Sequence, residues 1–366
     1  EKNKLEEKIK LLKNNNETLN FNYNILININ EKIWDLLDEA KYEEINNSKQ
    51  LILFKQQEDY NERRFRVKSK IDNILSSKIK EQKGYKFKKA MVLGHLGMGD
   101  QFYIVGMVRY LSTIYDEVLV VCKKNTEKNV KQIYSDDNTI KIMSVASDSS
   151  ISPVYGFNIN NFNKIFSGYQ KYLLGFHQHG IQNNCYGQGK IMYDLPFSFY
   201  DDVRVPYNIF WDYFYINKTE NSIKLYNTIK ENIENIKEYI FVHNTSSIGE
   251  VYNLNFVVEK FKLNIDETLI VNPCVNMYNE EHKFYKLAET FTNLPLLDCV
   301  DLIKNANIII MSDSGFLPLA VHLEIQTNKC FMYCRQGGGY SYTYDHFWSN
   351  KYGPTNTKLK KFKQIN

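Results

Sequence analysis

A glycine-rich turn that ends in an acidic residue is the first segment of the chain suited to chemistry. Its sequence GHLGMGD (residues 94–100) comes directly after a short apolar run. Glycines let the backbone turn sharply and approach a ligand closely, and a helix beginning here would present free N–H groups. Asp100 stands where that helix begins, so it can be an N-cap or a general base that deprotonates a hydroxyl. We expect Gly97, Met98 and Gly99 to line a cleft beside it.

The order of these glycines argues against two common nucleotide-binding motifs. The pattern is G-x-x-G-x-G, the reverse of the dinucleotide-binding G-x-G-x-x-G. The next apolar run ends in Cys122, Lys123 and Lys124, where a dinucleotide fold would place an acidic residue for a ribose. A phosphate-binding P-loop needs Lys and Ser or Thr after its glycines, and this turn has neither.

A second turn with polar side chains lies late in the chain. The sequence MSDSGFLPLA (residues 311–320) follows the most apolar run of the second half and leads into a helical pattern. Ligands of open α/β folds bind at the carboxyl edge of the sheet, where such a turn would place hydroxyls and backbone N–H groups. The turn predicts a phosphate or sugar site, although Ser and Asp could also serve only as helix caps. The residues expected to bind are Ser312, Asp313, Ser314, Gly315 and Phe316.

Two further apolar runs are also followed by polar side chains that could bind a ligand. The sequence FVHNTSSIG (residues 241–249) gathers an imidazole, an amide and hydroxyls, and an Asn closes the next run. We expect these groups to meet at the edge of a second sheet and to hold the same ligand. The alternative is that they only cap their loops. The candidate ligand contacts are His243, Asn244, Thr245, Ser246 and Asn272.

No metal or cofactor site is expected. His177 and His179 are two residues apart, but a metal ion needs further ligands and no third candidate stands out. The sequence also lacks the Asp-x-Asp triplet that holds a divalent ion on a diphosphate. We expect His177 and His179 to line the cleft on the side of Asp100, or else to lie on the plain surface.

Short apolar runs alternate with helical patterns on both sides of an aromatic-rich middle, which is typical of βαβ units. The predicted fold class is α/β, with Rossmann-like domains at 86–225 and 226–350 facing a cleft. Strands are expected at 90–93, 117–122, 140–145, 239–242, 269–272, 307–311 and 329–333. Helices are expected at 100–111, 280–291, 298–306 and 317–323, an irregular segment at 150–215 and a basic tail at 351–366.

Residues 1–85 differ from the rest of the chain. They contain no Pro, and Leu5, Ile9, Leu12 and Leu19 fall at helical spacing. The segment is therefore predicted to be a helical extension. It could be a coiled-coil stalk through which the chain forms a homo-oligomer, or a linker to an upstream domain. The alternative is a helical hairpin packed on the enzyme.

Composition and charge narrow the class of protein. The 43% of hydrophobic residues is enough for folded cores. The net charge of +4 is small for this length and does not suggest nucleic-acid binding. No apolar run reaches the roughly 18–20 residues that span a bilayer. The 6 cysteines form no CxxC pair, so we expect buried, reduced thiols and a cytoplasmic location.

The two glycine turns together resemble a known arrangement. The Gly-x-Gly-Asp turn and the late Asp-Ser-Gly turn resemble those of the heptosyltransferase-like family, whose GT-B fold has two Rossmann-like domains facing a cleft. The resemblance implies metal-independent sugar transfer with inversion at the sugar carbon. It implies that Asp100 is the base and that Asp313, Ser314 and Gly315 bind the donor diphosphate. The chain departs from the family at Pro318, in a neighbourhood where the family often has a His.

The function predicted from these motifs is glycosyl transfer. The expected partners are a nucleotide diphosphate-sugar as donor and a glycan or other hydroxyl compound as acceptor. One alternative is a sugar-nucleotide epimerase or hydrolase of the same fold. Another is a non-catalytic module that binds a nucleotide or glycan and is presented on a helical stalk.

Overall fold

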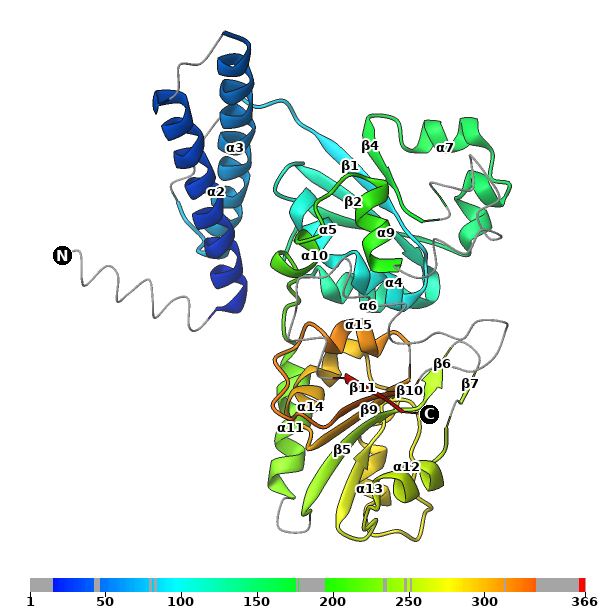
Figure 1. The fold of residues 1–366 in the computed structure, drawn as a ribbon. Helices are drawn as coiled ribbons and strands as arrows, with labels where there is room; N and C mark the ends of the chain where they lie inside the picture. The colour runs from blue at the N-terminus through cyan, green and yellow to red at the C-terminus, as the bar shows by residue number, and fades with distance from the viewer. Residues whose placement is uncertain are drawn as a thin grey trace, which may run out of the picture.

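Two α/β units and a pair of N-terminal helices make up the computed structural model (Figure 1). In Figure 1 the unit built on β1 to β4 lies above the unit built on β5 to β11. The helix pair, α2 (Glu17–Tyr42) and α3 (Asn47–Ile74), lies beside the upper unit. Parallel sheets flanked by helices confirm the predicted α/β class. The structure describes residues 16–42, 47–78, 81, 84–175, 177, 195–232, 236–246, 249–250, 252–312, 314–333 and 362–365.

The first sheet is parallel and runs in the order β3-β2-β1-β4. Three of its strands are predicted from their apolar runs, namely β1 (Lys89–Leu93), β2 (Glu117–Lys123) and β3 (Ile140–Val145). The fourth, β4 (Tyr169–Leu173), is not predicted by its sequence YQKYL. It lies at the edge of the sheet with mostly half-buried positions, so it lacks the continuous apolar run of a central parallel strand.

The described part of the middle of the chain contains regular elements, so the prediction of an irregular segment is wrong there. Besides β4, residues 150–215 contain α7 (Ile159–Ile165), α9 (Leu195–Asp202) and α10 (Ile209–Asp212). These helices are only four to eight residues long, which is too short to show a clear helical repeat. Their aromatic residues contribute to the core, where the buried side chains include Phe162, Phe199, Tyr200 and Phe210.

The helix predicted after the glycine turn is divided in two, α4 (Met98–Tyr103) and α5 (Val105–Leu111). The hydroxyl group of Tyr200 lies at the break. It accepts a hydrogen bond from the N–H of Met107 and donates one to the carbonyl of Tyr103, each at 3.1 Å. A continuous helix would bond these two backbone groups to each other. The inserted hydroxyl therefore accounts for the break.

The second sheet is also parallel, in the order β11-β10-β9-β5-β8. Its four predicted strands are confirmed to within about one residue at each end. A fifth strand, β11, pairs with β10 and buries Phe362 and Ile365. Residues 362–365 of the segment predicted as a basic tail therefore belong to the sheet, which the sequence did not predict. The strands are β5 (Glu238–His243), β8 (Thr268–Val271), β9 (Ile308–Ser312), β10 (Cys330–Tyr333) and β11 (Phe362–Ile365).

The helices around this sheet are shorter than predicted. The segments expected to be helical form α13 (Tyr285–Glu289), α14 (Val300–Asn305) and α15 (Phe316–Ala320). A 3-10 turn, η6 (Leu296–Cys299), precedes α14. Two further helices, α11 (Glu220–Glu231) and α12 (Leu254–Phe261), and a short hairpin of β6 (Thr245–Ser246) and β7 (Gly249–Glu250) are not predicted.

The N-terminal helix pair is packed on the first unit. Arg66 in α3 donates to both carboxylate oxygens of Asp116 at 3.1 Å, and Phe21 in α2 stacks on Tyr215 with ring centroids 4.7 Å apart. This packing corresponds to the hairpin alternative, whereas association through residues 1–85 stays a prediction. No helix in the described ranges is both long and apolar enough to cross a membrane.

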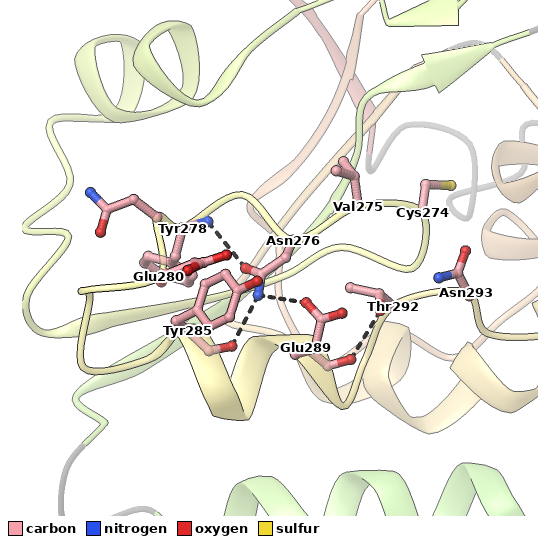
Figure 2. Close-up of a pocket in the computed structure, with 10 residues that line it drawn as sticks. Cys274, Val275, Asn276, Tyr278, Glu280, Tyr285, Glu289, Thr292 and Asn293 are labelled. Carbon is pink, nitrogen blue, oxygen red and sulfur yellow. Dashed lines mark hydrogen bonds between the residues drawn. The ribbon is translucent and has the colours of Figure 1, made fainter.

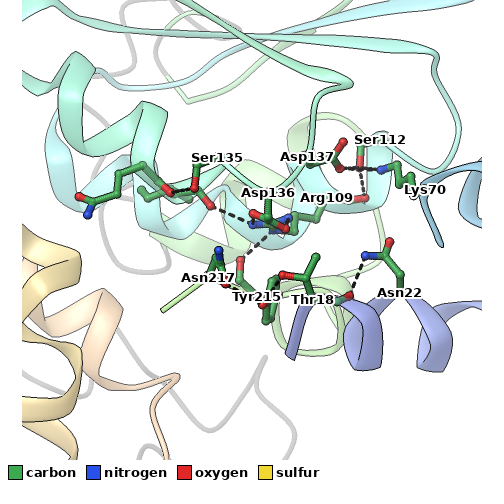
Figure 3. A network of polar contacts seen from close by, with 12 residues as sticks. Thr18, Asn22, Lys70, Arg109, Ser112, Ser135, Asp136, Asp137, Tyr215 and Asn217 are labelled. Carbon is green, nitrogen blue, oxygen red and sulfur yellow. Dashed lines mark hydrogen bonds and ion pairs between the residues drawn. The ribbon is translucent and has the colours of Figure 1, made fainter. Parts of the chain in front are cut away.

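A buried polar network strengthens this attachment (Figure 3). Arg109, 2% exposed, donates to both carboxylate oxygens of Asp136 at 2.8 and 2.9 Å and to the carbonyl of Tyr215 at 2.8 Å. Beside it, Lys70 from α3 donates to Asp137 at 2.6 Å. Burial lowers the pKa of Lys70, while Asp137 opposes the shift. Helix α3 therefore contributes an amino group that hydrogen-bonds inside the first unit.

Candidate active site

Asp100 lies in the first turn of α4, at the carboxyl end of β1. Gly97 is the N-cap of this helix, and a Cβ added there would lie 2.5 Å from Asp100 Oδ2. The glycine is therefore needed for the carboxylate to fold back over the turn. Burial raises the pKa of Asp100 to about 7, and the nearby carboxylate of Asp148 adds to the rise while Lys123 opposes it. An Asp with this pKa can take up or release a proton near neutrality.

Polar groups follow or end all four strands of the first sheet, at the edge that carries Asp100. His95 follows β1, Lys123 ends β2, Asp148 follows β3 and His177 follows β4. His95 Nδ1 lies 3.9 Å from Asp100 Oδ1, and Lys123 Nζ lies 3.2 Å from Asp148 Oδ2. His177 Nε2 lies 3.8 Å from Asp148 Oδ1. Parallel strands bring these residues to one edge although the chain separates them widely.

The two histidines of this group are neutral at pH 7. Burial lowers the pKa of His95 to about 3, and the neighbouring His177 adds to that effect. Burial also lowers the pKa of His177 to about 4, although Asp148 opposes the shift. The Nδ1 of His177 lies 2.7 Å from the hydroxyl oxygen of Ser152. Gly175 lets His95 approach, because its φ of +57° and its contact with the imidazole leave no room for a Cβ.

The second sheet presents a cluster of hydroxyls around a buried imidazole. His243, at the end of β5, is 6% exposed, and its Nδ1 lies 2.9 Å from Ser314 Oγ and 3.3 Å from Ser312 Oγ. Its Nε2 lies 3.2 Å from Thr245 Oγ1. The Phe316 ring covers it, with centroids 4.6 Å apart. Burial lowers the pKa of His243 to about 4, so the imidazole is neutral at pH 7.

The two predicted asparagines next to this cluster form hydrogen bonds with other protein groups. Asn244 donates to the carbonyl of Tyr252 at 2.9 Å, and Asn272 donates to the amide oxygen of Asn244 at 2.8 Å. The amide oxygen of Asn272 accepts the N–H of Cys274. Both Asn side chains are buried, at 1% and 2% exposure, and they join the loops after β5 and β8.

The two turns that carry Asp100 and Ser314 touch each other. A Cβ at Gly99 would lie 3.6 Å from the Cα of Gly315, and one at Gly315 would lie 3.7 Å from Met98 Cβ. The structure therefore brings together most of the residues predicted from the two glycine motifs.

A pocket of about 570 Å³ opens after β8 (Figure 2). Asn276 donates to the Glu289 carboxylate at 2.9 Å and to the carbonyl of Tyr285 at 3.0 Å. Cys274 also lines the pocket, and the hydroxyl of Thr245 donates to its sulfur at 3.2 Å. The pocket therefore adjoins the hydroxyl cluster. The sequence gives no motif for it, because its residues follow a strand without glycines or a repeated pattern.

Some predicted site residues lie outside the described residues, and the predicted burial of the thiols holds only in part. Asp313 and His179 are outside them, as is the side chain of Ser246. Cys274 is exposed, so the prediction that the thiols are buried is wrong for it, whereas Cys122, Cys299 and Cys330 are buried. Within the described ranges, no three His, Cys, Asp or Glu side chains come together as a metal site.

Comparison with known proteins gives only distant structural similarity. No protein family matches the chain, and no curated sequence does. A glycosyl transferase family 9 structure from Veillonella parvula is similar with a TM-score of 0.45 and 9% identity, over 77% of this chain and 88% of that chain. TibC from enterotoxigenic E. coli, a bacterial iron-containing dodecameric glycosyltransferase, is similar with a TM-score of 0.38 and 12% identity, over 77% and 74% of the two chains.

Proposed function

We propose that this chain is a GT-B glycosyltransferase that moves a sugar from a nucleotide diphosphate-sugar to an acceptor hydroxyl. The observation that carries the proposal is the placement of Asp100. Its pKa of about 7 suits a general base at neutral pH. It also stands one residue from the contact between Gly99 and Gly315, so the base lies beside the turn proposed to hold the donor.

The donor diphosphate would bind at the cluster on the second sheet. Ser312 and Ser314 surround the neutral His243 and can turn their hydroxyls toward phosphate oxygens. These groups would stabilise the leaving diphosphate by hydrogen bonds in the place of a metal ion. Attack from the side of Asp100 would displace the diphosphate with inversion at the sugar carbon. Closure of the two units would keep water from the donor.

The nucleoside would occupy the pocket after β8. The volume of about 570 Å³ falls within the roughly 300–1,000 Å³ range of ligand pockets. Glu289 and Asn276 offer hydrogen-bonding groups for ribose hydroxyls, and the ring of Tyr285 offers an apolar surface for a base. The hydrogen bond between Thr245 and Cys274 connects this pocket to the proposed diphosphate cluster.

A thermal-shift screen tests the donor half of the proposal. The chain is melted alone and with UDP, GDP, CDP, dTDP or ADP, each with and without EDTA. A ligand of the folded state raises the melting temperature by mass action. We expect one diphosphate to raise it, and EDTA to leave that rise unchanged. A rise that EDTA removes would contradict metal independence, and no rise with any diphosphate would contradict the donor site.

The second part of the proposal is transfer of the sugar to an acceptor. It is tested with the nucleotide-sugar that corresponds to the diphosphate found to bind. We expect the sugar to appear on a hydroxyl of an added acceptor, with an anomeric configuration opposite to that of the donor. Consumption of the donor without any acceptor would instead indicate a hydrolase or epimerase. Binding without turnover across an acceptor panel would indicate a non-catalytic module.

A further inference from the structure

The pocket after β8 has an acidic lining. Two carboxylates, Glu280 and Glu289, line it, and none of the described residues around it is Lys, Arg or His. Phosphate oxygens need cations or N–H donors, whereas carboxylates accept hydrogen bonds from N–H and O–H groups. The lining therefore suits the uncharged nucleoside of a nucleotide rather than its diphosphate.

The first part of the pocket follows the order of a nucleoside diphosphate (Figure 2). Cys274 lies at one end, and the Thr245 hydroxyl that donates to its sulfur also lies 3.2 Å from His243 in the cluster proposed for the diphosphate. Asn276 and Glu289 lie in the middle, joined by a hydrogen bond of 2.9 Å. A ribose in the middle would therefore direct its base to the end away from Cys274.

Glu280 and Tyr285 line that far end of the pocket. Glu280 is exposed, and in the described part of the chain its carboxylate forms no hydrogen bond or ion pair. Both of its oxygens are therefore available to a ligand, whereas one oxygen of Glu289 already accepts the Asn276 amide. The end of the pocket where a base would lie thus offers an aromatic ring and an unpaired carboxylate.

The nucleic acid bases differ in what they can offer to such a carboxylate. Guanine places the donors N1–H and N2–H side by side, and they match the two oxygens of one carboxylate. Adenine and cytosine place their amino group beside a ring nitrogen that accepts, and uracil and thymine place N3–H between carbonyl oxygens. A carboxylate repels these acceptors, so it favours guanine by attraction and disfavours the other bases by repulsion.

We propose that Glu280 recognises the base of the donor and that this base is guanine. The donor is then a guanosine diphosphate-sugar, with guanine against Tyr285, ribose at Glu289 and the diphosphate beyond Cys274. The inference rests on the proposed function, because it names the nucleotide of that same donor site. Glu280 is a specificity-determining residue, since it contacts a part of the donor that takes no part in the transfer of the sugar.

Inosine diphosphate (IDP) tests this assignment, because it differs from GDP only in lacking the N2 amino group. Calorimetric titration gives the Kd of both nucleotides for the parent chain and for Glu280→Gln. The parent chain is expected to bind GDP about 10- to 100-fold more tightly than IDP, the scale of a hydrogen bond to a charged group. In Glu280→Gln we expect this ratio to fall by about tenfold or more, because the amide presents a donor to N1–H.

Two matched variants show which carboxylate is responsible. Glu281→Gln removes the same charge from an exposed neighbour that is not among the residues lining the pocket, so it should leave the ratio unchanged. Glu289→Gln removes a proposed ribose contact, so it should weaken GDP and IDP alike. Loss of a negative charge can strengthen the binding of any anionic nucleotide, and for this reason the ratio within each chain is compared. Thermal unfolding shows whether each variant is folded.

The inference is overturned if UDP, CDP, dTDP or ADP binds more tightly than GDP, or if the parent chain binds GDP and IDP equally. It is also overturned if folded Glu280→Gln keeps the parent ratio, or if the ratio is lost in Glu281→Gln or Glu289→Gln instead. Failure of every diphosphate to bind would refute the proposed donor site and the inference with it. The expected ratios in a chain that transfers no sugar would refute the proposed transfer alone.

Discussion

The Cα of Gly315 lies 3.6 Å from the point where a side chain on Gly99 would begin. Each glycine belongs to a turn at the carboxyl end of a strand, β1 for Gly99 and β9 for Gly315. The two sheets thus meet backbone to backbone at their functional edges. Asp100 and Ser314 are the next residues along the chain from this contact, one on each side. The separation between the proposed base and the proposed donor site therefore depends on the absence of large side chains here.

Gly99→Leu is expected to hold the two units apart. An Ala at this position places its Cβ at ordinary contact distance from Gly315, so Gly99→Ala should retain most activity. A Leu needs space that Gly315 and Pro318 already fill. We expect kcat/KM to fall by about 10²-fold, the scale of a 1 Å displacement of reacting groups. The control is Gly84→Leu, because no atom lies within 4 Å of a Cβ there. Full activity in Gly99→Leu would show that the contact does not matter.

Asp100→Asn is expected to abolish proton abstraction while preserving the shape of the turn. General-base catalysis contributes about 10²–10⁴-fold, so kcat should fall by that factor. The melting-temperature rise caused by the nucleoside diphosphate should be unchanged, because the donor cluster lies on the other sheet. Transfer at the parent rate in this variant would remove Asp100 from the mechanism.

Asp100 should also make stability depend on pH. Its folded pKa of about 7 lies above the ordinary 3.8, so its favourable contribution is complete below pH 3.8 and is lost as pH rises through 7. Asp100→Asn, which stays neutral, should therefore gain stability over the parent chain as pH rises from 4 to 8. Linkage bounds the gain at about 4 kcal/mol. Urea unfolding at both pH values measures it, and a constant difference would show that Asp100 is ionised normally.

His243 should give the opposite pH dependence. Its pKa is lowered from 6.5 to about 4, so its contribution is complete above pH 6.5 and is lost as pH falls through 4. His243→Gln should therefore be less stable than the parent chain at pH 7, with the difference shrinking toward pH 4 by at most about 3 kcal/mol. Urea unfolding across this range tests the prediction, which fails if the difference is independent of pH.

Arg109→Met is expected to be strongly destabilising. Arg109 and Asp136 are 2% and 5% exposed, so the variant leaves a buried carboxylate without its partner. Loss of one member of a buried pair costs about 3–5 kcal/mol. Lys32→Met is the control, because the pair of Lys32 with Asp35 is exposed to solvent and contributes little to stability. Equal unfolding free energies for the two variants would contradict the importance assigned to the Arg109 network.

The sequence predicted the central strands and the two glycine turns because each depends on local residue types. Val, Ile and Leu runs mark buried parallel strands wherever they stand, and glycines such as Gly97 mark a turn that approaches other atoms closely. The edge strands β4 and β11 were not predictable in the same way. Their sequences YQKYL and FKQI contain polar residues, and they become strands only by pairing with a neighbour.

The surroundings of Asp100 depend on tertiary structure in the same manner. Lys123, Asp148 and His177 come from three different strand ends, and none forms a motif along the chain. His95 lies within the glycine motif, but its neutral state follows from burial between Gly175 and Phe199, which only the fold brings there. The insertion of the Tyr200 hydroxyl between α4 and α5 is likewise a long-range contact.

Strand β11 has a consequence for how the chain can be shortened. It contributes only Phe362–Ile365, yet it supplies the outer hydrogen-bonding partner of β10. A chain ending before residue 362 would leave the backbone of Cys330–Tyr333 open along one side. Exposed strand edges recruit other chains, so such a truncated protein should aggregate during purification rather than simply lose activity.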